Sequence, residues 1–456
     1  MNHQRRARLV VLCVVALLAT TACFGGSDDE TVYTVTITPP SVADTVDTGD
    51  ATVVTEAVDT GSSAASTGWA VNTAGCADRA AVISPITDTL IIGSVAPQTG
   101  GLITAIYKPV VQGFQAYIDK TNAEHLLGNV QLEYVVADDG GNSELTPLAV
   151  VGLLDSGADV VSGVIGSSSN LAIRGQLNKA CVPQLMALGN SPKLGEVGNA
   201  PWTMSGEVPV NVETTIYVNS ISRTIGEDST IGLLVTDDDA GTAYSSSFVA
   251  AASETEVEVI SQQTVPAANI DPPSIALVTL ADKRPDVVVA SLAGAACATF
   301  LTELAKVRDA VDGWEPAVYM SGTCADPTLL RLAGDAADGV LTSANLTTDE
   351  PVFLAAMDEL GIVSGLAGAA EGWNAAEITV AILIAAAASE QGLTRESIID
   401  EARQMSVQPS LARPGVRFTT NGTTDPFAAE SLQIVRFESD SDEFVDVGDL
   451  VAQFES

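Results

Sequence analysis

The chain has 456 residues, enough for about two or three domains of ordinary size. It carries 58 Asp and Glu against 20 Lys and Arg, which gives a formal net charge of −38 at pH 7. Nucleic acids and anionic membrane surfaces are bound through basic patches, so this charge argues against both as partners. An acidic protein would attract cationic solutes, although acidity more often only keeps a protein soluble.

The N-terminus has the three parts of a secretory signal. Three arginines within the first eight residues precede an apolar run over 9–19, and small residues then lead to Cys23. The residues before Cys23 resemble the lipobox of bacterial lipoproteins, although Thr20 stands where that pattern usually has Leu. The resemblance implies a lipoprotein signal peptide over 1–22 and lipidation of Cys23. The exported protein would then be anchored to the outer face of the cell membrane through this lipid only; a signal peptide cleaved elsewhere is the alternative.

Residues 23–75 have the composition of a linker. They are rich in Thr, Ser, Asp, Val and Gly, contain two adjacent prolines and show no helical period. A segment of this kind cannot bury enough apolar surface to fold by itself. We therefore predict a disordered acidic linker that lets the folded part of the chain sample the space beside the membrane.

The folded region is predicted to begin with a strand, a loop and a helix. An apolar run over 90–95 ends at a loop that contains Pro and Gly, and apolar residues then recur every three or four positions over 106–117. In an open α/β sheet, ligands bind at the loops that leave the carboxyl ends of the strands. This makes Gln98, Thr99 and Gly100 candidate binding residues. The alternative is an ordinary turn that contains glycine.

The same alternation continues along the chain as two lobes. We expect first-lobe strands over 131–137, 160–166 and 182–187, with helices around 145–154 and ending at Ala180. The pattern restarts near Val208. We expect second-lobe strands over 230–236, 257–265, 287–292 and 317–321, and a terminal strand pair over 433–437 and 443–447.

These elements predict an α/β fold with two doubly wound parallel-sheet lobes, joined by three crossovers, with a ligand cleft between the lobes. We expect the first lobe to comprise residues 76–206 and 344–408. The second lobe should comprise residues 207–343 and 409–450.

Four cysteines remain after the signal and the lipidation site, and an even number in an exported protein points to disulfides. Four cysteines allow three pairings. Because Cys297 and Cys324 each follow a predicted strand on the same side of one sheet, we predict that they pair, which leaves Cys76 to pair with Cys181. The alternative, a zinc site, lacks close CxxC spacing and nearby His.

The residues of the folded region resemble the type I periplasmic binding proteins, and within them the leucine/isoleucine/valine-binding branch that serves ABC importers. No single motif carries the resemblance; it lies in the order and spacing of several segments over about 88–437. These segments are IIGSVAPQTGG at 91–101, residues 112–118, VVSGVIGSSSN at 160–170, CVPQLMA at 181–187, RPDVVVASL at 284–292 and AGDAADGVLTS at 333–343.

The resemblance implies where a ligand would bind in the first lobe. Amino-acid-binding members hold the ligand carboxylate with hydroxyls and backbone N–H groups at helix starts, and helix N-termini suit an anion. The positions that match here are Ser167, Ser168, Ser169, Ala187, Leu188, Gly189, Asn190 and Ser191. The serine run would also serve as an N-cap, and capping does not exclude binding.

The match is weaker in the second lobe. The family often has Tyr-Gly in the loop after its first strand there, where this chain has Ala240-Gly241. The family's ammonium-binding acid falls near Gly322 and Thr323, where no carboxylate stands. A zwitterion needs an anion for its ammonium, because an unpaired buried charge is costly. Nearby loops supply the further candidates Asp237, Asp238, Asp239, Ala240 and Gly294, although a run of three aspartates is more often simply solvated.

The function expected from the resemblance is that of a solute receptor. A small amino-acid-like, carboxylate or amide solute would bridge the lobes, and the closed form would dock on an ABC permease; we expect a monomer, no cofactor and no catalysis. A hydrolase is poorly supported, because His3 leaves with the signal and His125 lies near the end of a predicted helix. No GxGxxG or GxxxxGK[ST] loop is present. The remaining alternative is a ligand-sensing receptor that signals rather than transports.

Overall fold

A computed structural model of the chain describes residues 69–267 and 271–454. The predicted signal peptide, the lipidation site Cys23 and the linker as far as residue 68 lie outside the described residues. The last part of the predicted linker is folded, which corrects the boundary expected at residue 75. Val71 is buried, and its N–H donates to the Asp400 carboxylate at 2.8 Å. The folded region therefore begins at about Trp69.

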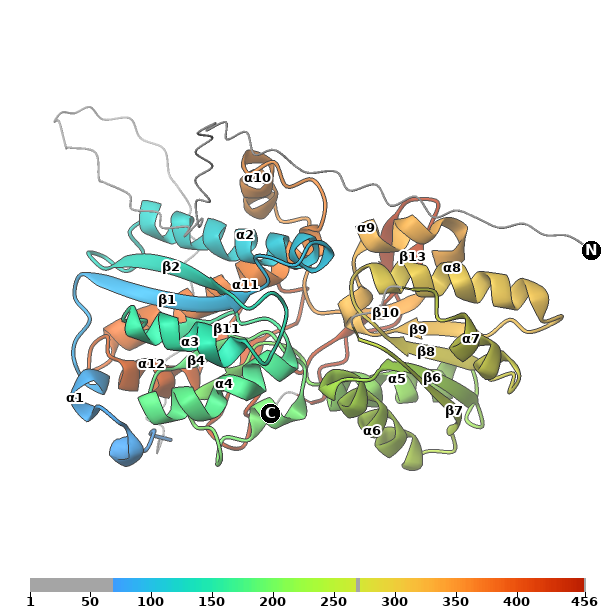
Figure 1. The fold of residues 1–456 in the computed structure, drawn as a ribbon, viewed down its shortest axis with the longest axis horizontal. Helices are drawn as coiled ribbons and strands as arrows, with labels where there is room; N and C mark the ends of the chain where they lie inside the picture. Colours follow the sequence, from blue (N-terminus) through green and yellow to red (C-terminus); the bar gives the residue numbers. More distant parts are fainter. Residues whose placement is uncertain (1–68, 268–270, 455–456) are drawn as a thin grey trace, which may run out of the picture. The chain divides into compact units, whose positions relative to one another are not determined.

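The first lobe is built on a parallel sheet with the strand order β2-β1-β3-β4-β5 (Figure 1). Its strands are β1 (Thr89–Ala96), β2 (Gln131–Asp138), β3 (Val160–Ser162), β4 (Gln184–Ala187) and β5 (Thr203–Ser205). Its helices are α1 (Arg79–Val82), α2 (Leu102–Ala123), α3 (Thr146–Asp155), α4 (Ser167–Ala180), α10 (Pro351–Glu359), α11 (Leu366–Ala388) and α12 (Arg395–Ala402). Short 3-10 turns η1 (Thr73–Gly75) and η2 (Pro192–Gly195) complete it.

Helices cover both faces of this sheet. One core contains residues of α2 and α11, such as Phe114 and Trp373, whereas the other contains residues of α3 and α4, such as Leu153 and Ile173. Glycines allow α2 and α11 to pack with their backbones in contact. A side chain at Gly372 would overlap the carbonyl group of Val110. This close packing fixes the position of α11 relative to the first sheet.

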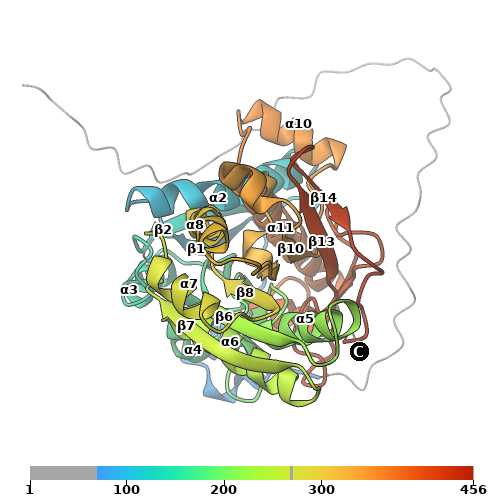
Figure 2. The same cartoon turned by 90° about the vertical axis from the view of Figure 1, so that its right-hand side faces the viewer.

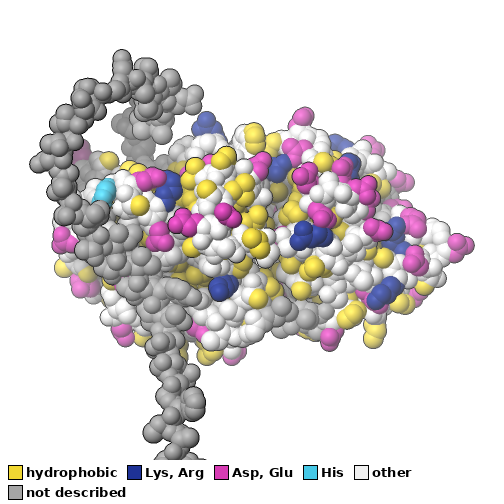
Figure 3. Space-filling model, turned by 90° about the horizontal axis from the view of Figure 1, so that it is seen from above, with side chains coloured by type: hydrophobic (Ala, Val, Ile, Leu, Met, Phe, Trp, Pro, Cys, Tyr) yellow, Lys and Arg dark blue, Asp and Glu magenta, His cyan; other side chains and the backbone are white. Residues whose placement is uncertain are grey.

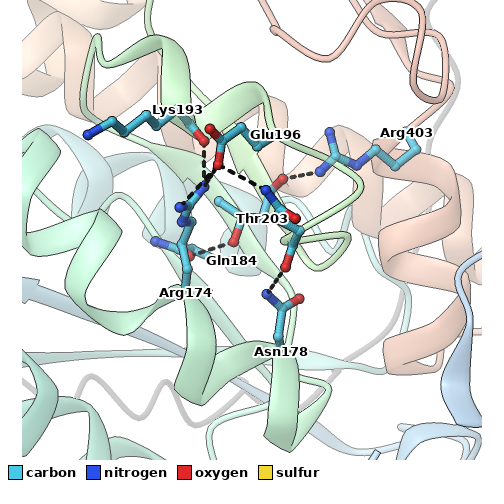
Figure 4. A network of polar contacts seen from close by, with 8 residues as sticks. Arg174, Asn178, Gln184, Lys193, Glu196, Thr203 and Arg403 are labelled. Atoms are coloured by element: carbon cyan, nitrogen blue, oxygen red, sulfur yellow. Dashed lines mark hydrogen bonds and ion pairs between the residues drawn. The ribbon is translucent and has the colours of Figure 1, made fainter. Parts of the chain in front are cut away.

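A polar network holds the edge of the first sheet (Figure 4). The guanidinium of the buried Arg403 donates to the carbonyl oxygen of Thr203, and the Thr203 hydroxyl donates to the side-chain oxygen of Gln184 at 2.8 Å. Nearby, Arg174 of α4 pairs with Glu196 just after η2. These contacts fix the chain on both sides of the loop that joins β4 to η2.

The second lobe has a sheet with the strand order β14-β13-β10-β9-β8-β6-β7, in which β13 runs antiparallel to both of its neighbours, β10 and β14 (Figure 2). Its strands are β6 (Thr230–Thr236), β7 (Glu258–Val265), β8 (Val287–Ser291), β9 (Ala317–Met320), β10 (Leu341–Ala344), β13 (Gln433–Glu438) and β14 (Glu443–Asp446). Its helical segments are α5 (Val210–Thr224), α6 (Asp239–Ser253), α7 (Ser274–Ala281), α8 (Ala295–Ala310), α9 (Pro327–Leu330), η3 (Gly322–Cys324) and η4 (Arg331–Ala337).

This second sheet is also covered on both faces. Residues of α7 and α8 share one core with the sheet, and residues of α5 and α6 share the other. The predicted fold class, two doubly wound α/β lobes, is thus confirmed.

On the face seen in Figure 3, acidic side chains are spread among other side chains rather than gathered in one patch.

The chain passes between the two sheets after β5, after β10 and before β13. Residues that follow the predicted boundary at 409 pack with the first lobe. Leu411, Val416 and Phe418 are fully buried in the core that contains α2 and α11, and β12 (Phe418–Thr419) pairs with β11 (Ser406–Val407). This packing favours a boundary near Ser431 over the one expected at 409.

Two further details differ from expectation. The strand expected over 160–166 ends at Ser162, because Gly163 adopts a positive φ of 69° that no extended strand contains. The short strand β5 was missed, because three residues are too few for a periodic pattern. Both predicted disulfides are present, Cys76 with Cys181 and Cys297 with Cys324.

Within the described residues, α11 is the one helix that is long and apolar enough to cross a membrane. It is instead a core helix of the first lobe, because 72% of its most apolar window is buried inside the protein.

Candidate functional site

A cavity of about 150 Å³ is lined by residues of both lobes. The first lobe contributes the loop after β4 and one face of α11, and the second lobe contributes α5 and the turn after β9. Each of the three chain passages between the lobes also contributes, through residues 206–208, 344–348 and Leu432. A cavity of this size accommodates a molecule about as large as benzene.

The face of α11 that lines the cavity carries two polar side chains. Ala367, Ala370, Glu371 and Asn374 follow the spacing i, i+3, i+4, i+7, which places them on one side of a helix. The two alanines leave room for the cavity, and the close packing of α11 on α2 fixes the helix from the other side.

The second lobe contributes a buried carboxylate. Glu213 of α5 accepts hydrogen bonds on Oε1 from the Gly322 N–H at 2.7 Å and from the Ser343 hydroxyl at 2.7 Å. Burial raises the pKa of Glu213, and the hydrogen bonds from Ser343 and Gly322 oppose that rise. A carboxylate therefore lies beside Gly322 in space, although the expected acid is missing at that position of the sequence. It comes from a helix that begins more than a hundred residues earlier in the chain.

Two more carboxyl groups line the cavity. Burial, together with the negative charges of Glu371 and Glu213, raises the pKa of Glu207 to about 8. Burial and the nearby Asp326 raise the pKa of Glu371 to about 7, although this side chain remains exposed at the cavity. Among the described residues, neither carboxyl group has a hydrogen-bond donor or an ion-pair partner. Both are therefore available to a ligand.

Asn374 is buried, with only 3% of its surface exposed, and its side-chain oxygen has no hydrogen-bond partner among the described residues. Buried amide oxygens in folded proteins almost always accept a hydrogen bond. Because Asn374 lines the cavity, a donor on a bound molecule would satisfy it.

Four of the predicted site residues line the cavity: Leu188, Asn190, Gly322 and Thr323. The Thr323 hydroxyl is already engaged, since it donates to the Leu292 carbonyl oxygen at 2.6 Å. The loop from Ala187 to Ser191 and the turn after β9 are therefore brought together across the cavity, as their positions at strand ends suggested.

The serine run at the start of α4 lies beside the cavity rather than along it. Ser167 donates to the side-chain oxygen of Asn190 at 3.3 Å, and Asn190 in turn lines the cavity. Ser169 turns into its own lobe, where its hydroxyl donates to Asp139 at 3.4 Å. Ser168 is half-buried and does not line the cavity.

The loop at Gln98, Thr99 and Gly100 is organised by Asp138 at the end of β2. The Asp138 carboxylate accepts from the N–H groups of Gln98 and Thr99 and from the Thr99 hydroxyl. Burial alone would raise the pKa of Asp138, but hydrogen bonds from Thr99, Gly140 and Gln98 outweigh it and lower that pKa. None of the three loop residues lines the cavity.

The aspartate run of the second lobe has structural partners. Asp238 caps α6 by accepting from the Gly241 N–H at 2.9 Å, and Asp237 accepts from the Ala267 N–H at 3.0 Å. Asp239 is in the first turn of α6, where a negative charge favours the helix. Neither these residues nor Ala240 lines the cavity, whereas Glu213 does.

Gly294, at the start of α8, contacts the first lobe. A side chain there would fall 2.7 Å from the terminal methyl group of Ile106 on α2. The lobes thus meet at this point, and Gly294 does not line the cavity.

The site residues predicted from the sequence did not include the three glutamates that line the cavity, or Asn374. A signal existed for Glu213, which shares one buried helix face with Ile216, Tyr217 and Ser220. A charged residue on such a face needs a partner or a function. Glu207 lies in a passage between the lobes and carries no such signal.

The described residues contain no group of three or more His, Cys, Asp or Glu that could hold a metal ion. The two lobes and the cavity that both of them line are typical of a protein that binds a small molecule between its lobes. Comparisons with known proteins agree with this class.

The family described as Periplasmic binding protein matches residues 89–442. The chain therefore belongs to the periplasmic binding protein family, whose members bind solutes and perform no catalysis. No curated protein sequence is significantly similar to this chain.

Solved structures share the fold at low sequence identity. A branched chain amino acid ABC transporter from Thermus thermophilus with bound valine has a TM-score of 0.71 and 18% identity, over 80% of this chain and 97% of that one. A solute binding protein of an ABC transporter from Rhodopseudomonas palustris BisB5, in complex with 3,4-dihydroxy benzoic acid, has a TM-score of 0.68 and 20% identity, over 79% and 97%. A solute binding protein from R. palustris in complex with benzoate has a TM-score of 0.66 and 17% identity, over 80% and 98%.

Proposed function

We propose that this protein is the extracytoplasmic solute receptor of an ABC importer. It binds a small solute in the cavity between its lobes and presents the closed form to a permease, as a monomer and without catalysis. The observation that carries the proposal is that both lobes and all three passages between them line one cavity. A solute held there contacts both lobes, so its binding favours the closed arrangement.

The similar structures support a transport role rather than sensing. All three are described as ABC transporter proteins, and they contain valine, 3,4-dihydroxy benzoic acid or benzoate. The signal and lipobox-like residues before Cys23 agree with an exported receptor that a lipid holds close to its permease. Amino acids and small aromatic acids are accordingly the first solutes to test.

The test is thermal unfolding of the purified exported protein with a panel of small solutes. The protein is first unfolded in denaturant with its disulfides intact, dialysed and refolded, so that solute retained from the cell is removed. A solute at a hundred times its dissociation constant stabilises the folded state by about 2.7 kcal/mol, which raises the melting temperature measurably.

Two substitutions on one helix provide the control. Ala367→Phe places a ring in the cavity and should abolish the shift caused by any solute. Ala385→Phe adds the same ring at an exposed position of α11 and should leave the shift intact. A shift that survives Ala367→Phe would contradict binding in this cavity.

A further inference from the structure

The cavity is acidic and carries no opposing charge. Glu207, Glu213 and Glu371 line it, and no Lys, Arg or His is among its lining residues in the described part of the chain. Opposite charges attract each other more strongly inside a protein than in water. A bound anion would meet three carboxyl groups and no cation.

The hydrogen-bonding groups of the cavity point to the same conclusion. The carboxyl groups of Glu207 and Glu371 lack donors among the described residues, and the side-chain oxygen of Asn374 is buried without a partner. The hydroxyls of Ser343 and Thr323 already donate to Glu213 and to a backbone carbonyl. Because the side-chain oxygens of Glu207, Glu371 and Asn374 await donors, the cavity suits a molecule that offers N–H groups.

Two kinds of cation fit this chemistry poorly. The carboxyl groups do not converge into a group that could hold a metal ion. A quaternary ammonium ion offers no N–H and is normally held by aromatic rings, whereas none of the described aromatic residues lines the cavity. A primary ammonium group offers three donors and a full charge, as the lysine side chain does.

We propose that the solute of this protein is a small primary amine without a carboxylate, with Glu207, Glu213 and Glu371 holding its ammonium charge and Asn374 accepting one of its N–H groups. This inference rests on the proposed function as a solute receptor. A diamine of about four carbons matches the cavity in size, and its two ammonium groups supply N–H donors and positive charge for the three carboxyl groups. Neither the valine nor the benzoate found in similar structures has this character.

The experiment is isothermal titration calorimetry of the refolded protein at pH 8. The probes are 1,4-diaminobutane, n-butylamine, tetramethylammonium, valine, benzoate and magnesium chloride, at constant ionic strength. We expect saturable one-to-one binding of the diamine, weaker binding of n-butylamine, and none of tetramethylammonium or magnesium. Salt screens attraction to an acidic surface much more than attraction inside a cavity. Diamine binding in the cavity should therefore persist at 0.3 M sodium chloride.

Variants locate the binding. Glu371→Gln and Glu207→Gln keep the side-chain shape, and each should weaken diamine binding at least about tenfold. Asn374→Leu should weaken it as well. Glu390→Gln changes an exposed carboxyl group at the end of the same helical region and should have no effect. Equal diamine affinity in all four variants would overturn the inference.

The panel separates the two proposals. If valine or benzoate binds and the amines do not, the solute-receptor function stands and the amine inference fails. If the amines bind but binding survives Ala367→Phe, the cavity is not their site and the inference also fails. If no amine binds, the inference is overturned, whatever the other probes do.

Discussion

The Glu213 carboxylate accepts a hydrogen bond from the Gly322 N–H at 2.7 Å. It joins the helix α5 to the turn after β9 within the second lobe, and its oxygen also receives the Ser343 hydroxyl. Glu213 thus has two roles. It stabilises the turn that forms one wall of the cavity, and it contributes negative charge to the site.

The two roles of Glu213 can be separated by substitution. Glu213→Ala leaves a backbone N–H and a hydroxyl buried without an acceptor, so it should lower the free energy of unfolding by about 2–4 kcal/mol. Glu213→Gln keeps an oxygen for both donors and should change stability by less than about 1 kcal/mol. Urea unfolding of the two variants measures the difference; equal losses would show that the hydrogen bonds contribute nothing.

Solute binding should depend on pH through Glu207 and Glu371. Their pKa values, about 8 and about 7, lie above the ordinary value for glutamate, so both carboxyl groups bind protons near neutral pH. A primary amine keeps its charge up to about pH 10. The affinity for 1,4-diaminobutane should therefore rise from pH 6 to pH 8.5, and each carboxyl group that must ionise contributes about tenfold per pH unit only below its own pKa.

The groups around these two carboxyls set the background for that experiment. Glu213 acts on Glu207, Asp326 acts on Glu371, and the hydroxyl of Tyr107 interacts with both carboxyl groups and with Asp238. The hydroxyls of Tyr217 and Tyr244 interact with Glu213. Binding near pH 7 should release protons, which calorimetry detects by comparing buffers of different ionisation enthalpy. Affinity that is flat from pH 6 to pH 8.5 would mean that neither carboxyl group ionises on binding.

The same carboxyl groups should destabilise the empty protein as pH rises. A pKa that is higher in the folded state than in the unfolded state means that the folded state binds more protons between the two values, so stability falls with rising pH in that window. For Glu207 the window runs from about 4.5 to about 8. Glu207→Gln should therefore melt at a higher temperature than the parent at pH 8 and at nearly the same temperature at pH 4.5. A constant difference would contradict the raised pKa.

The packing of α11 on α2 predicts opposite effects for two glycine substitutions. Gly372→Ala would drive a methyl group into the Val110 carbonyl, and overpacking of this kind costs about 1–3 kcal/mol. Gly152→Ala in α3 meets nothing within 4 Å and should stabilise by about 0.5–1 kcal/mol, because alanine favours the helix. Chemical unfolding distinguishes them. Since Gly372 adjoins Glu371, its substitution should also weaken solute binding.

The disulfides should contribute unequally to stability. Cys76 and Cys181 are 105 residues apart, whereas Cys297 and Cys324 are 27 apart. If a disulfide acts by reducing the entropy of the unfolded chain, the first disulfide stabilises the folded state by about 4.7 kcal/mol and the second by about 3.5 kcal/mol. Replacing each pair by serine and measuring urea unfolding tests the order. A larger loss for Cys297 and Cys324 would show that native packing, rather than chain entropy, dominates.

The sequence determined the architecture because periodic burial is a local property. Strands such as β6 (Thr230–Thr236) alternate with amphipathic helices, and that alternation is sufficient to predict two doubly wound lobes. Cysteine placement relative to strand ends was also sufficient to predict both disulfides. The loops at strand ends located two cavity walls, at Asn190 and Gly322.

The chemistry of the site was decided only by the tertiary structure. Gly322 has no acid near it in sequence, yet the carboxylate of Glu213 lies 2.7 Å from its nitrogen because α5 packs beside β9. Glu207 and Glu371 lie far apart in the sequence, yet both line the same cavity. Conversely, Asp237, Asp238 and Asp239 looked suited to a ligand but serve α6 and its loop. Local sequence reports which residues are polar, whereas the charge of a cavity depends on side chains that only long-range packing brings together.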